Sequence, residues 1–191
     1  MRIGVLAVQG AFAEHIRVAE ELGVECVELR QERDVEQSLD GVILPGGEST
    51  VQGKLIRELG MYDRLKGRIT GGLPVLATCA GLILLAEKIA DSDTVHFGTL
   101  PAVVRRNAYG RQLGSFYAEE EFGDLGKIPM TFIRAPYIKE VKPGVEVLAE
   151  VDGHIAGVRY KNQIAVSFHP ELDHNPAIHR QFIEMCGKVN R

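Results

Sequence analysis

The sequence predicts an α/β fold with a mainly parallel central sheet, helices on its faces and an antiparallel extension. In the first half, short apolar segments alternate with segments of helical periodicity, which is the pattern of a parallel sheet covered on both faces. After residue 100 the pattern changes to short strand-like segments separated by turn residues, which is typical of antiparallel strands. No repeat, low-complexity tract or Pro/Gly/Ser linker divides the chain, so we expect residues 1–191 to form a single domain.

Four short strands and three helices are expected in the first half. The predicted strands are residues 2–9, 24–29, 41–44 and 74–77. The predicted helices are residues 11–22, a segment that is capped by Ser49 or Thr50 and ends at Leu59, and a segment between Met61 and Thr70. Gly23 lies where the first helix should stop, and Pro45-Gly46-Gly47 separates the third strand from the second helix.

The second half is expected to contain strands joined by turns, followed by one helix. The predicted strands are residues 103–104, 116–121, 130–133, 146–151, 155–160 and 164–168. Asp152-Gly153 lies between two of them and is a hairpin signal, because both residue types accept a positive φ. A last helix at residues 176–189 is expected to close the domain.

The composition is that of a globular protein without a nucleic-acid or membrane partner. Hydrophobic residues make up 45% and charged residues 25% of the chain, and the net charge of −4 gives no broad basic field for nucleic acid or an anionic membrane. The apolar runs are far shorter than the roughly 20 residues of a membrane helix. Residues 1–6 enter a strand without a signal-peptide pattern. The three cysteines, an odd number, indicate free thiols in a reducing cytosol, so we expect a cytoplasmic protein.

A cysteine lies at the boundary between the strand at residues 74–77 and the helix-like segment after it. The residues around Cys79 are small, as a sharp strand-to-helix turn requires: Ala77, Ala80 and Gly81. Such a turn presents its central side chain to a cleft, and the amino terminus of the helix favours a thiolate. Taken alone, the same stretch also fits a buried cysteine with a packing role, which is our interpretation for Cys26 and Cys186.

The segment SFHPEL at residues 167–172 follows the last predicted strand. A thiol nucleophile needs a base, and the base needs a carboxylate that orients it. His169 and Glu171 fit these roles, and Pro170 between them restricts the backbone so that the two side chains keep a fixed relation. Sites in open α/β sheets form beyond the carboxyl ends of the strands. The sequence therefore predicts Cys79, His169 and Glu171 as a catalytic triad.

The same region offers a second interpretation, as a metal site. Its possible ligands are His169, Glu171, Asp173, His174 and His179. Their spacing matches no common zinc pattern, and a metal site would leave the turn at Cys79 unexplained. We therefore expect no bound metal, and Asp173 and His174 fit a solvated loop.

The segment LPGGEST at residues 44–50 follows the third predicted strand. It has no Gly-Lys-Ser/Thr ending and no spaced glycines, so it is not expected to bind a nucleotide phosphate. If the thiol attacks a carbonyl carbon, the resulting oxyanion needs two N–H donors. Ala80, directly after the nucleophile, can supply one, and Gly47 in its glycine turn can supply the other. We predict Gly47 and Ala80 as an oxyanion hole.

Together these motifs resemble those of the triad-type, class I glutamine amidotransferases. That class usually has Gly-x-Cys-x-Gly at the nucleophile, where this chain has Ala77, and a His-Gln or Met-Gln pair where this chain has Leu82-Ile83. Several motifs, in the same order, resemble the family of glutaminase subunits of pyridoxal 5'-phosphate synthase. They are AVQGAFAEH (7–15), LPGGEST (44–50), TCAGLILLA (78–86), RRNAYGRQ (105–112), FIRAP (132–136) and SFHPEL (167–172).

The resemblance implies the flavodoxin-like fold of the class I glutamine amidotransferases, hydrolysis of L-glutamine, and passage of ammonia to a separate synthase subunit within a large hetero-oligomer. It implies no cofactor in this chain. It also implies that the glutamine pocket is lined by Gly47, Glu48, Ser49, Arg106, Ile133 and Arg134. The planar fork of an arginine suits the α-carboxylate of glutamine. Gln9, Gly10 and His15 are candidates for the mouth of the site or the partner interface, although for His15 we favour a polar helix face.

Three alternatives remain open from the sequence. A glutaminase that serves another acceptor, such as imidazole glycerol phosphate synthase, would share the triad. A cysteine hydrolase or peptidase on a similar sheet would act on other substrates. A binding module that kept the fold would have no activity to lose, but the three filled triad positions favour an enzyme.

Overall fold

The computed structural model describes residues 1–90, 92–106 and 114–189. Residues 107–112 of the RRNAYGRQ motif therefore lie outside the described residues. In the described ranges, none of the helices combines the length and the apolar character that crossing a membrane requires.

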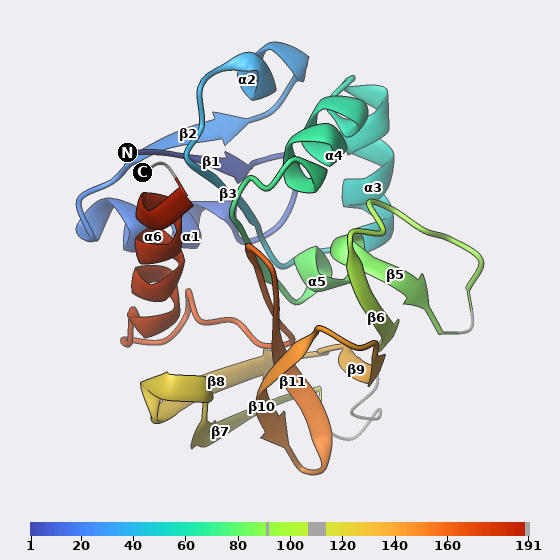
Figure 1. The fold of residues 1–191 in the computed structure, drawn as a ribbon, viewed down its shortest axis with the longest axis vertical. Helices are drawn as coiled ribbons and strands as arrows, with labels where there is room; N and C mark the ends of the chain where they lie inside the picture. Colours follow the sequence, from blue (N-terminus) through green and yellow to red (C-terminus); the bar gives the residue numbers. More distant parts are fainter. Residues whose placement is uncertain (91, 107–113, 190–191) are drawn as a thin grey trace.

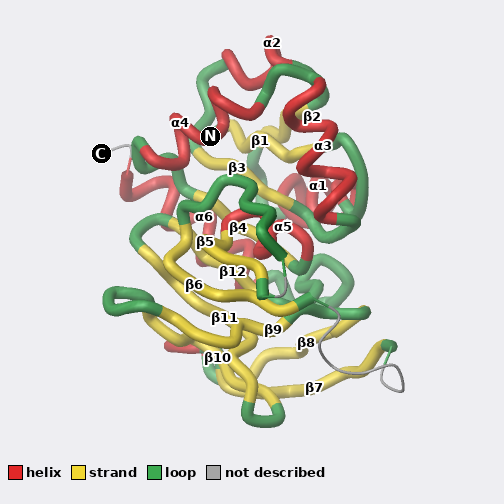
Figure 2. Tube along the Cα trace, turned by 90° about the vertical axis from the view of Figure 1, so that its right-hand side faces the viewer, coloured by secondary structure: helices red, strands yellow, loops and turns green. Residues whose placement is uncertain are grey.

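A central sheet runs through the molecule in the strand order β2-β1-β3-β4-β12-β11-β9-β6-β5, with β10 paired to β11 (Figure 1). Its strands are β1 (Arg2–Leu6), β2 (Glu25–Leu29), β3 (Gly41–Leu44), β4 (Val75–Thr78), β5 (Ala86–Ile89), β6 (Leu100–Arg105), β9 (Tyr137–Val141), β10 (Glu146–Val151), β11 (His154–Tyr160) and β12 (Gln163–Val166). The neighbours from β2 to β12 are parallel, and so are β5 and β6, whereas the remaining pairs are antiparallel. A separate antiparallel pair, β7 (Ser115–Glu121) and β8 (Lys127–Ile133), lies at the strand-rich end of the molecule (Figure 2).

Helices cover both faces of the parallel strands, as the alternating pattern predicts (Figure 1). They are α1 (Phe12–Glu21), α2 (Glu32–Glu36), α3 (Ser49–Glu58), α4 (Tyr62–Thr70), α5 (Ala80–Leu85) and α6 (Ala177–Val189), with a short 3-10 helix at Gly123–Leu125. Neighbouring residues of β3 belong to the two opposite cores: Ile43 is in the same core as Phe182 of α6, and Leu44 is in the same core as Ile56 of α3. The helices α1 and α6 therefore share one face, and α3 lies on the other.

The predicted fold class is confirmed, but several details differ from the prediction. Local periodicity does not reveal α2, β5 or β9, and β5 follows α5 without a break because one apolar run continues across the boundary. Residues 164–168, expected in the antiparallel extension, form most of β12, which is parallel to β4 and antiparallel to β11. The second predicted helix begins at Ser49, but Glu48 occupies the capping position instead of Ser49 or Thr50.

The carboxyl ends of β3, β4 and β12 meet at one edge of the sheet, because these three strands are parallel neighbours. The segments that leave this edge contain Gly47, Cys79 and His169. The backbone N–H of Cys79 donates a hydrogen bond of 2.8 Å to the carbonyl oxygen of Val166, so the turn after β4 is tied to the end of β12. The sheet topology thus brings together segments that are far apart in the sequence.

Candidate active site

The turn between β4 and α5 holds Cys79 in a strained backbone conformation. Cys79 has φ 49° and ψ −101°, a region that non-glycine residues rarely adopt. A Cβ on Gly81 would overlap the carbonyl oxygen of Leu44, so glycine allows α5 to approach the end of β3. The side chain of Cys79 is 7% exposed and reaches a pocket. The sharp strand-to-helix turn predicted at Cys79 is therefore present.

The other two cysteines lack this setting. Cys26 lies half-buried in β2, and Cys186 is fully buried in α6. Burial raises the pKa of Cys26 to about 11 and the pKa of Cys186 to about 12. Both side chains are therefore neutral thiols near pH 7 and pack against the core, and none of the three cysteines forms a disulfide.

His169 interacts with both Cys79 and a buried carboxylate. Nδ1 of His169 donates a hydrogen bond of 2.6 Å to Oε1 of Glu171, whose side chain is fully buried. Burial lowers the pKa of His169, but hydrogen bonds to Cys79 and Glu171 and the negative charges of both raise it to about 10. Burial raises the pKa of Glu171, but His15 and His169 outweigh this and lower it below its ordinary value. The arrangement places the imidazole between the sulfur of Cys79 and the carboxylate of Glu171, and it favours the protonated imidazole.

Two backbone contacts fix the imidazole of His169. Its own backbone N–H donates a hydrogen bond of 2.8 Å to the carbonyl oxygen of Thr131 in β8. A Cβ on Gly46 would overlap the imidazole ring, so the ring lies directly against the glycine turn after β3. The position of His169 therefore depends on three segments that are distant in the sequence.

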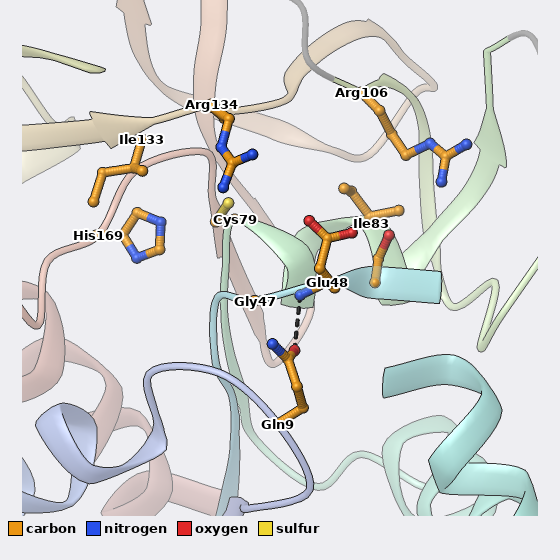
Figure 3. Close-up of a pocket in the computed structure, with 10 residues that line it drawn as sticks. Gln9, Gly47, Glu48, Cys79, Ile83, Arg106, Ile133, Arg134 and His169 are labelled. Atoms are coloured by element: carbon orange, nitrogen blue, oxygen red, sulfur yellow. Dashed lines mark hydrogen bonds between the residues drawn. The ribbon is translucent and has the colours of Figure 1, made fainter. Parts of the chain in front are cut away.

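A pocket of about 260 Å³ lies at this edge of the sheet (Figure 3). Its lining residues are Gln9, Gly47, Glu48, Ser49, Cys79, Ile83, Arg106, Ile133, Arg134 and His169. The volume is below the ~300–1,000 Å³ of sites for drug-sized ligands, so it suits a ligand of the size of a free amino acid. The backbone N–H of Glu48 donates a hydrogen bond of 2.8 Å to Oε1 of Gln9, which holds the glycine turn against the segment after β1 (Figure 3).

Two arginines line the pocket, and the side chain of Arg134 points toward Cys79 (Figure 3). Nη1 of Arg106 donates a hydrogen bond of 3.1 Å to Oγ1 of Thr50 in α3. Arg134 has a positive φ of 42°, and its backbone N–H donates a hydrogen bond of 2.7 Å to the carbonyl oxygen of Gly114. Their guanidinium groups can attract the carboxylate of a small ligand.

The structure brings most of the predicted site residues to this pocket. They are Cys79, His169, Gly47, Glu48, Ser49, Arg106, Ile133 and Arg134. Glu171 lies behind His169, and Ala80 is the first residue of α5, so its N–H has no acceptor within the helix. Gln9 lines the pocket wall, whereas Gly10 lies against Gly46. Sequence reasoning missed Ile83, although its position one helical turn after Cys79 could have indicated it.

The prediction that His15 occupies a polar helix face is wrong, because its side chain is fully buried. Nδ1 of His15 lies 2.9 Å from Nε2 of His179, and Nε2 of His15 lies 3.1 Å from Oγ1 of Thr78. The same Nε2 lies 3.3 Å from Oε2 of Glu171. Burial lowers the pKa of His15, and burial together with the charge of His15 lowers the pKa of His179 to about 3. A helical pattern cannot show that α6 covers this part of α1.

The possible ligands of the alternative metal interpretation lie around the segment after β12. Across the described ranges of the chain, no three or more His, Cys, Asp or Glu side chains are grouped so as to hold a metal ion. Asp173, expected in a solvated loop, is partly buried and accepts a hydrogen bond of 2.7 Å from Oγ1 of Thr131. His174 is exposed, as expected.

Acid should destabilise the fold through His179. Its pKa is lowered to about 3 in the folded chain, whereas the ordinary value is about 6.5, so only the unfolded state gains a proton as the pH falls from 6.5 toward 3. The lowered pKa of His179 therefore makes its full contribution to the free energy of unfolding above pH 6.5. About 2 kcal/mol of this contribution should be lost between pH 7 and pH 5. Urea unfolding at both pH values should show a smaller loss for His179→Gln than for the wild type.

The control for this measurement is His174→Gln, which replaces an exposed histidine of the neighbouring loop. The free energy of unfolding of each variant at pH 5 is compared with its own value at pH 7. A loss of packing energy that is the same at both pH values therefore cancels. An equal loss of stability in the wild type and in His179→Gln would contradict a neutral, buried His179.

Comparisons with known proteins agree on one family. The model of the SNO glutamine amidotransferase family matches residues 5–188. The chain is 65% identical over 184 residues to the pyridoxal 5'-phosphate synthase subunit PdxT of Desulfitobacterium hafniense (strain Y51), which covers 96% of this chain and 92% of that protein. It is 56% identical over 189 residues to the PdxT of Streptococcus pneumoniae (strain CGSP14), covering 97% of each. A crystal structure of a glutamine amidotransferase matches with a TM-score of 0.92 and 44% identity, covering 97% of this chain and 98% of the other.

Proposed function

Because the chain belongs to the SNO glutamine amidotransferase family, we propose that it hydrolyses L-glutamine to L-glutamate and ammonia as the glutaminase subunit of a pyridoxal 5'-phosphate synthase. The observation that carries the proposal is the interaction of His169 with both Cys79 and Glu171 beside a pocket of amino-acid size. Residues 1–191 act as one glutamine amidotransferase domain.

In the proposed mechanism, the sulfur of Cys79 attacks the side-chain amide carbon of glutamine. The N–H groups of Gly47 and Ala80 stabilise the oxyanion. His169 takes the proton of the thiol and gives it to the amide nitrogen as the C–N bond breaks, so ammonia leaves and a thioester remains. His169 then takes a proton from water, the hydroxide attacks the thioester, the C–S bond breaks to give glutamate, and the proton of His169 returns to the sulfur of Cys79. Glu171 keeps the imidazole aligned and stabilises its charged form.

The pocket walls are proposed to hold the amino-acid end of glutamine. Arg106 and Arg134 bind the α-carboxylate, for which a guanidinium fork is suited. The carboxylate of Glu48 pairs with the α-ammonium group, and Ser49 and Ile133 complete the wall. This set of opposite charges favours a free amino acid over a peptide, in which both groups are blocked.

Ammonia is proposed to pass to a synthase subunit, with both subunits in a large hetero-oligomer. The relatives that this chain resembles are named as subunits of pyridoxal 5'-phosphate synthase. Free ammonia in water at neutral pH would become ammonium, which is a poor nucleophile, so direct delivery preserves its reactivity. A reducing cytoplasm suits a reactive thiol and three cysteines that form no disulfide. The proposal includes no cofactor, metal, nucleic acid or membrane.

Ammonia release from L-glutamine, measured with and without the synthase subunit, tests the proposed function. We expect the synthase subunit to increase the rate sharply. L-asparagine, which is one methylene shorter, is the matched substrate and should be about 10- to 200-fold poorer in kcat/KM.

The other outcomes separate the alternatives. Glutamine hydrolysis that does not respond to the synthase subunit would point to a glutaminase for another acceptor. Hydrolysis of peptides instead of glutamine would indicate a cysteine peptidase. No hydrolysis under either condition would overturn the proposed function.

A further inference from the structure

Behind the candidate triad lies a row of buried polar side chains that the mechanism above does not use. Oε2 of Glu171 lies 3.3 Å from Nε2 of His15, and Nδ1 of His15 lies 2.9 Å from Nε2 of His179. Oγ1 of Thr78 lies 3.1 Å from Nε2 of His15. All four residues are fully buried. They come from α1, β4, α6 and the segment after β12, so four separate parts of the fold meet at Glu171.

One arrangement of protons gives the ring N–H groups of both histidines in this row an acceptor. An ionised carboxylate only accepts hydrogen bonds. Nε2 is the ring nitrogen of His15 that faces Glu171, so Nε2 carries the ring proton. Nδ1 of His15 is then an acceptor, and Nε2–H of His179 donates to it. Only acceptors of the row are then left without a completed hydrogen bond: Nδ1 of His179, and Oε2 of Glu171, which lies 3.3 Å from Nε2 of His15. If the proton of His15 were on Nδ1 instead, His179 would have to carry its own proton on Nδ1, where it has no partner. A lone pair of His15 would also face the carboxylate, so this arrangement is less favourable.

The charges around the row agree with this arrangement. The titratable groups near Glu171 are His169 on its own segment, His15 on α1 and His179 on α6. Glu14 on α1 also acts on His15. Burial lowers the pKa of His15 and of His179, so both are neutral donors at pH 7, while Glu171 keeps its charge.

We propose that His15 is a positioning residue, whose Nε2–H binds Oε2 of Glu171 and so holds Oε1 toward His169. His179 in turn keeps His15 in the tautomer that donates. A carboxylate held at one oxygen can rotate about its last bond, and a second donor removes this freedom, as the partners behind metal-bound histidines do. The inference rests on the proposed function, because that reaction requires the aligned imidazole of His169.

A packing role alone does not explain the row. Apolar side chains could pack α1 against α6 without any buried polar atom. The polar atoms buried there instead lose their hydration, which costs free energy. The row is also continuous with the reaction centre: Thr78 directly precedes Cys79 in the sequence, and Glu171 binds His169. Connected buried networks of this kind fix the orientation of their members.

Two replacements of His15 that differ in one hydrogen-bond donor test the inference. Phenylalanine fills the ring volume without a donor, whereas glutamine can place an amide N–H near the position of Nε2. In the presence of the synthase subunit, kcat for glutamine should fall about 10- to 100-fold in His15→Phe, and His15→Gln should recover part of the loss. KM should stay within about twofold in both variants, because His15 does not touch the pocket.

A second measurement does not depend on glutamine hydrolysis. The rate of alkylation of Cys79 by iodoacetamide, followed against pH, reports the thiolate–imidazolium pair. When Glu171 is no longer held, the imidazolium of His169 loses part of its stabilising charge. The pH of half-maximal alkylation should therefore rise by about one unit in His15→Phe and stay near the wild-type value in His15→Gln.

Ile178→Val is the matched packing control, because it shortens a buried side chain next to His179 and removes no polar group. It should lower Tm and leave the alkylation profile unchanged. A Cys79→Ser variant gives the background from the other cysteines. If His15→Phe does not fold, His179→Phe removes the donor to His15 and should shift the profile in the same direction by a smaller amount.

The results separate this inference from the proposed function. It would be overturned if folded His15→Phe shifts neither kcat nor the alkylation profile, if His15→Gln is as impaired as His15→Phe, or if Ile178→Val shifts the profile equally. A shifted alkylation profile in a protein that does not hydrolyse glutamine would support the positioning role and refute only the proposed reaction.

Discussion

Cys79→Ala is expected to lower ammonia release from glutamine by on the order of 10⁶-fold, because removing the nucleophile of a triad costs about as much as removing the whole triad. The thioester cannot form without the sulfur, whereas the pocket walls remain. Ammonia release should be measured with the synthase subunit present, where the rate is highest. Calorimetry should show that the variant still binds glutamine, since the arginines and Glu48 are unchanged.

Cys26→Ala is the matched control for this variant. It removes a half-buried thiol of β2 that lies outside the pocket, so it should retain the wild-type activity. Wild-type turnover in Cys79→Ala would show that another group attacks the substrate, and the proposed mechanism would have to be abandoned.

Glu171→Gln is expected to lower kcat by about 10⁴-fold, as the equivalent amide replacement does in serine proteases. Nδ1–H of His169 donates to one oxygen of this side chain, and Nε2 of His15 faces the other oxygen at 3.3 Å. A glutamine side chain offers one acceptor and one NH₂ group, so one of the two histidines must face a donor whichever way the amide turns. The protonated His169 also loses a counter-charge.

The pH profile of Glu171→Gln should change in a defined direction. Glu171 is one of the groups that raise the pKa of His169 to about 10, so the high-pH limit of activity should move to lower pH when its charge is removed. Glu150→Gln, at an exposed position of β10, is the control and should keep the wild-type profile. A folded Glu171→Gln enzyme with kcat within about tenfold of the wild type would contradict an orienting role for this carboxylate.

Several features could be predicted from the sequence because their causes are local. The hairpin at Asp152-Gly153 is confirmed, with φ of 50° and 73°, since only a few residue types accept these angles. The turn at Cys79 is similarly local, because small neighbours are needed for a tight backbone. His169 and Glu171 lie two positions apart, so their hydrogen bond depends on a short segment.

Strand pairing could not be predicted in the same way. Residues 164–168 have the composition of any buried strand, and nothing within them indicates that β12 pairs with β4 on one side and β11 on the other. The placement of Arg106 and Arg134 at one pocket also depends on strand pairing, since they directly follow β6 and β8, which belong to different sheets. Pairing depends on which edges are free once the other strands are in place, which is a property of the whole chain.

The sequence by itself determined the α/β class, the turn that carries Cys79 and the candidate residues His169 and Glu171. Only the tertiary structure decided that His15 and His179, 164 positions apart, face each other behind that carboxylate. The physical reason is that helical periodicity places a residue around its own helix, whereas the partner of each helix face depends on how α1 and α6 pack on the same side of the sheet.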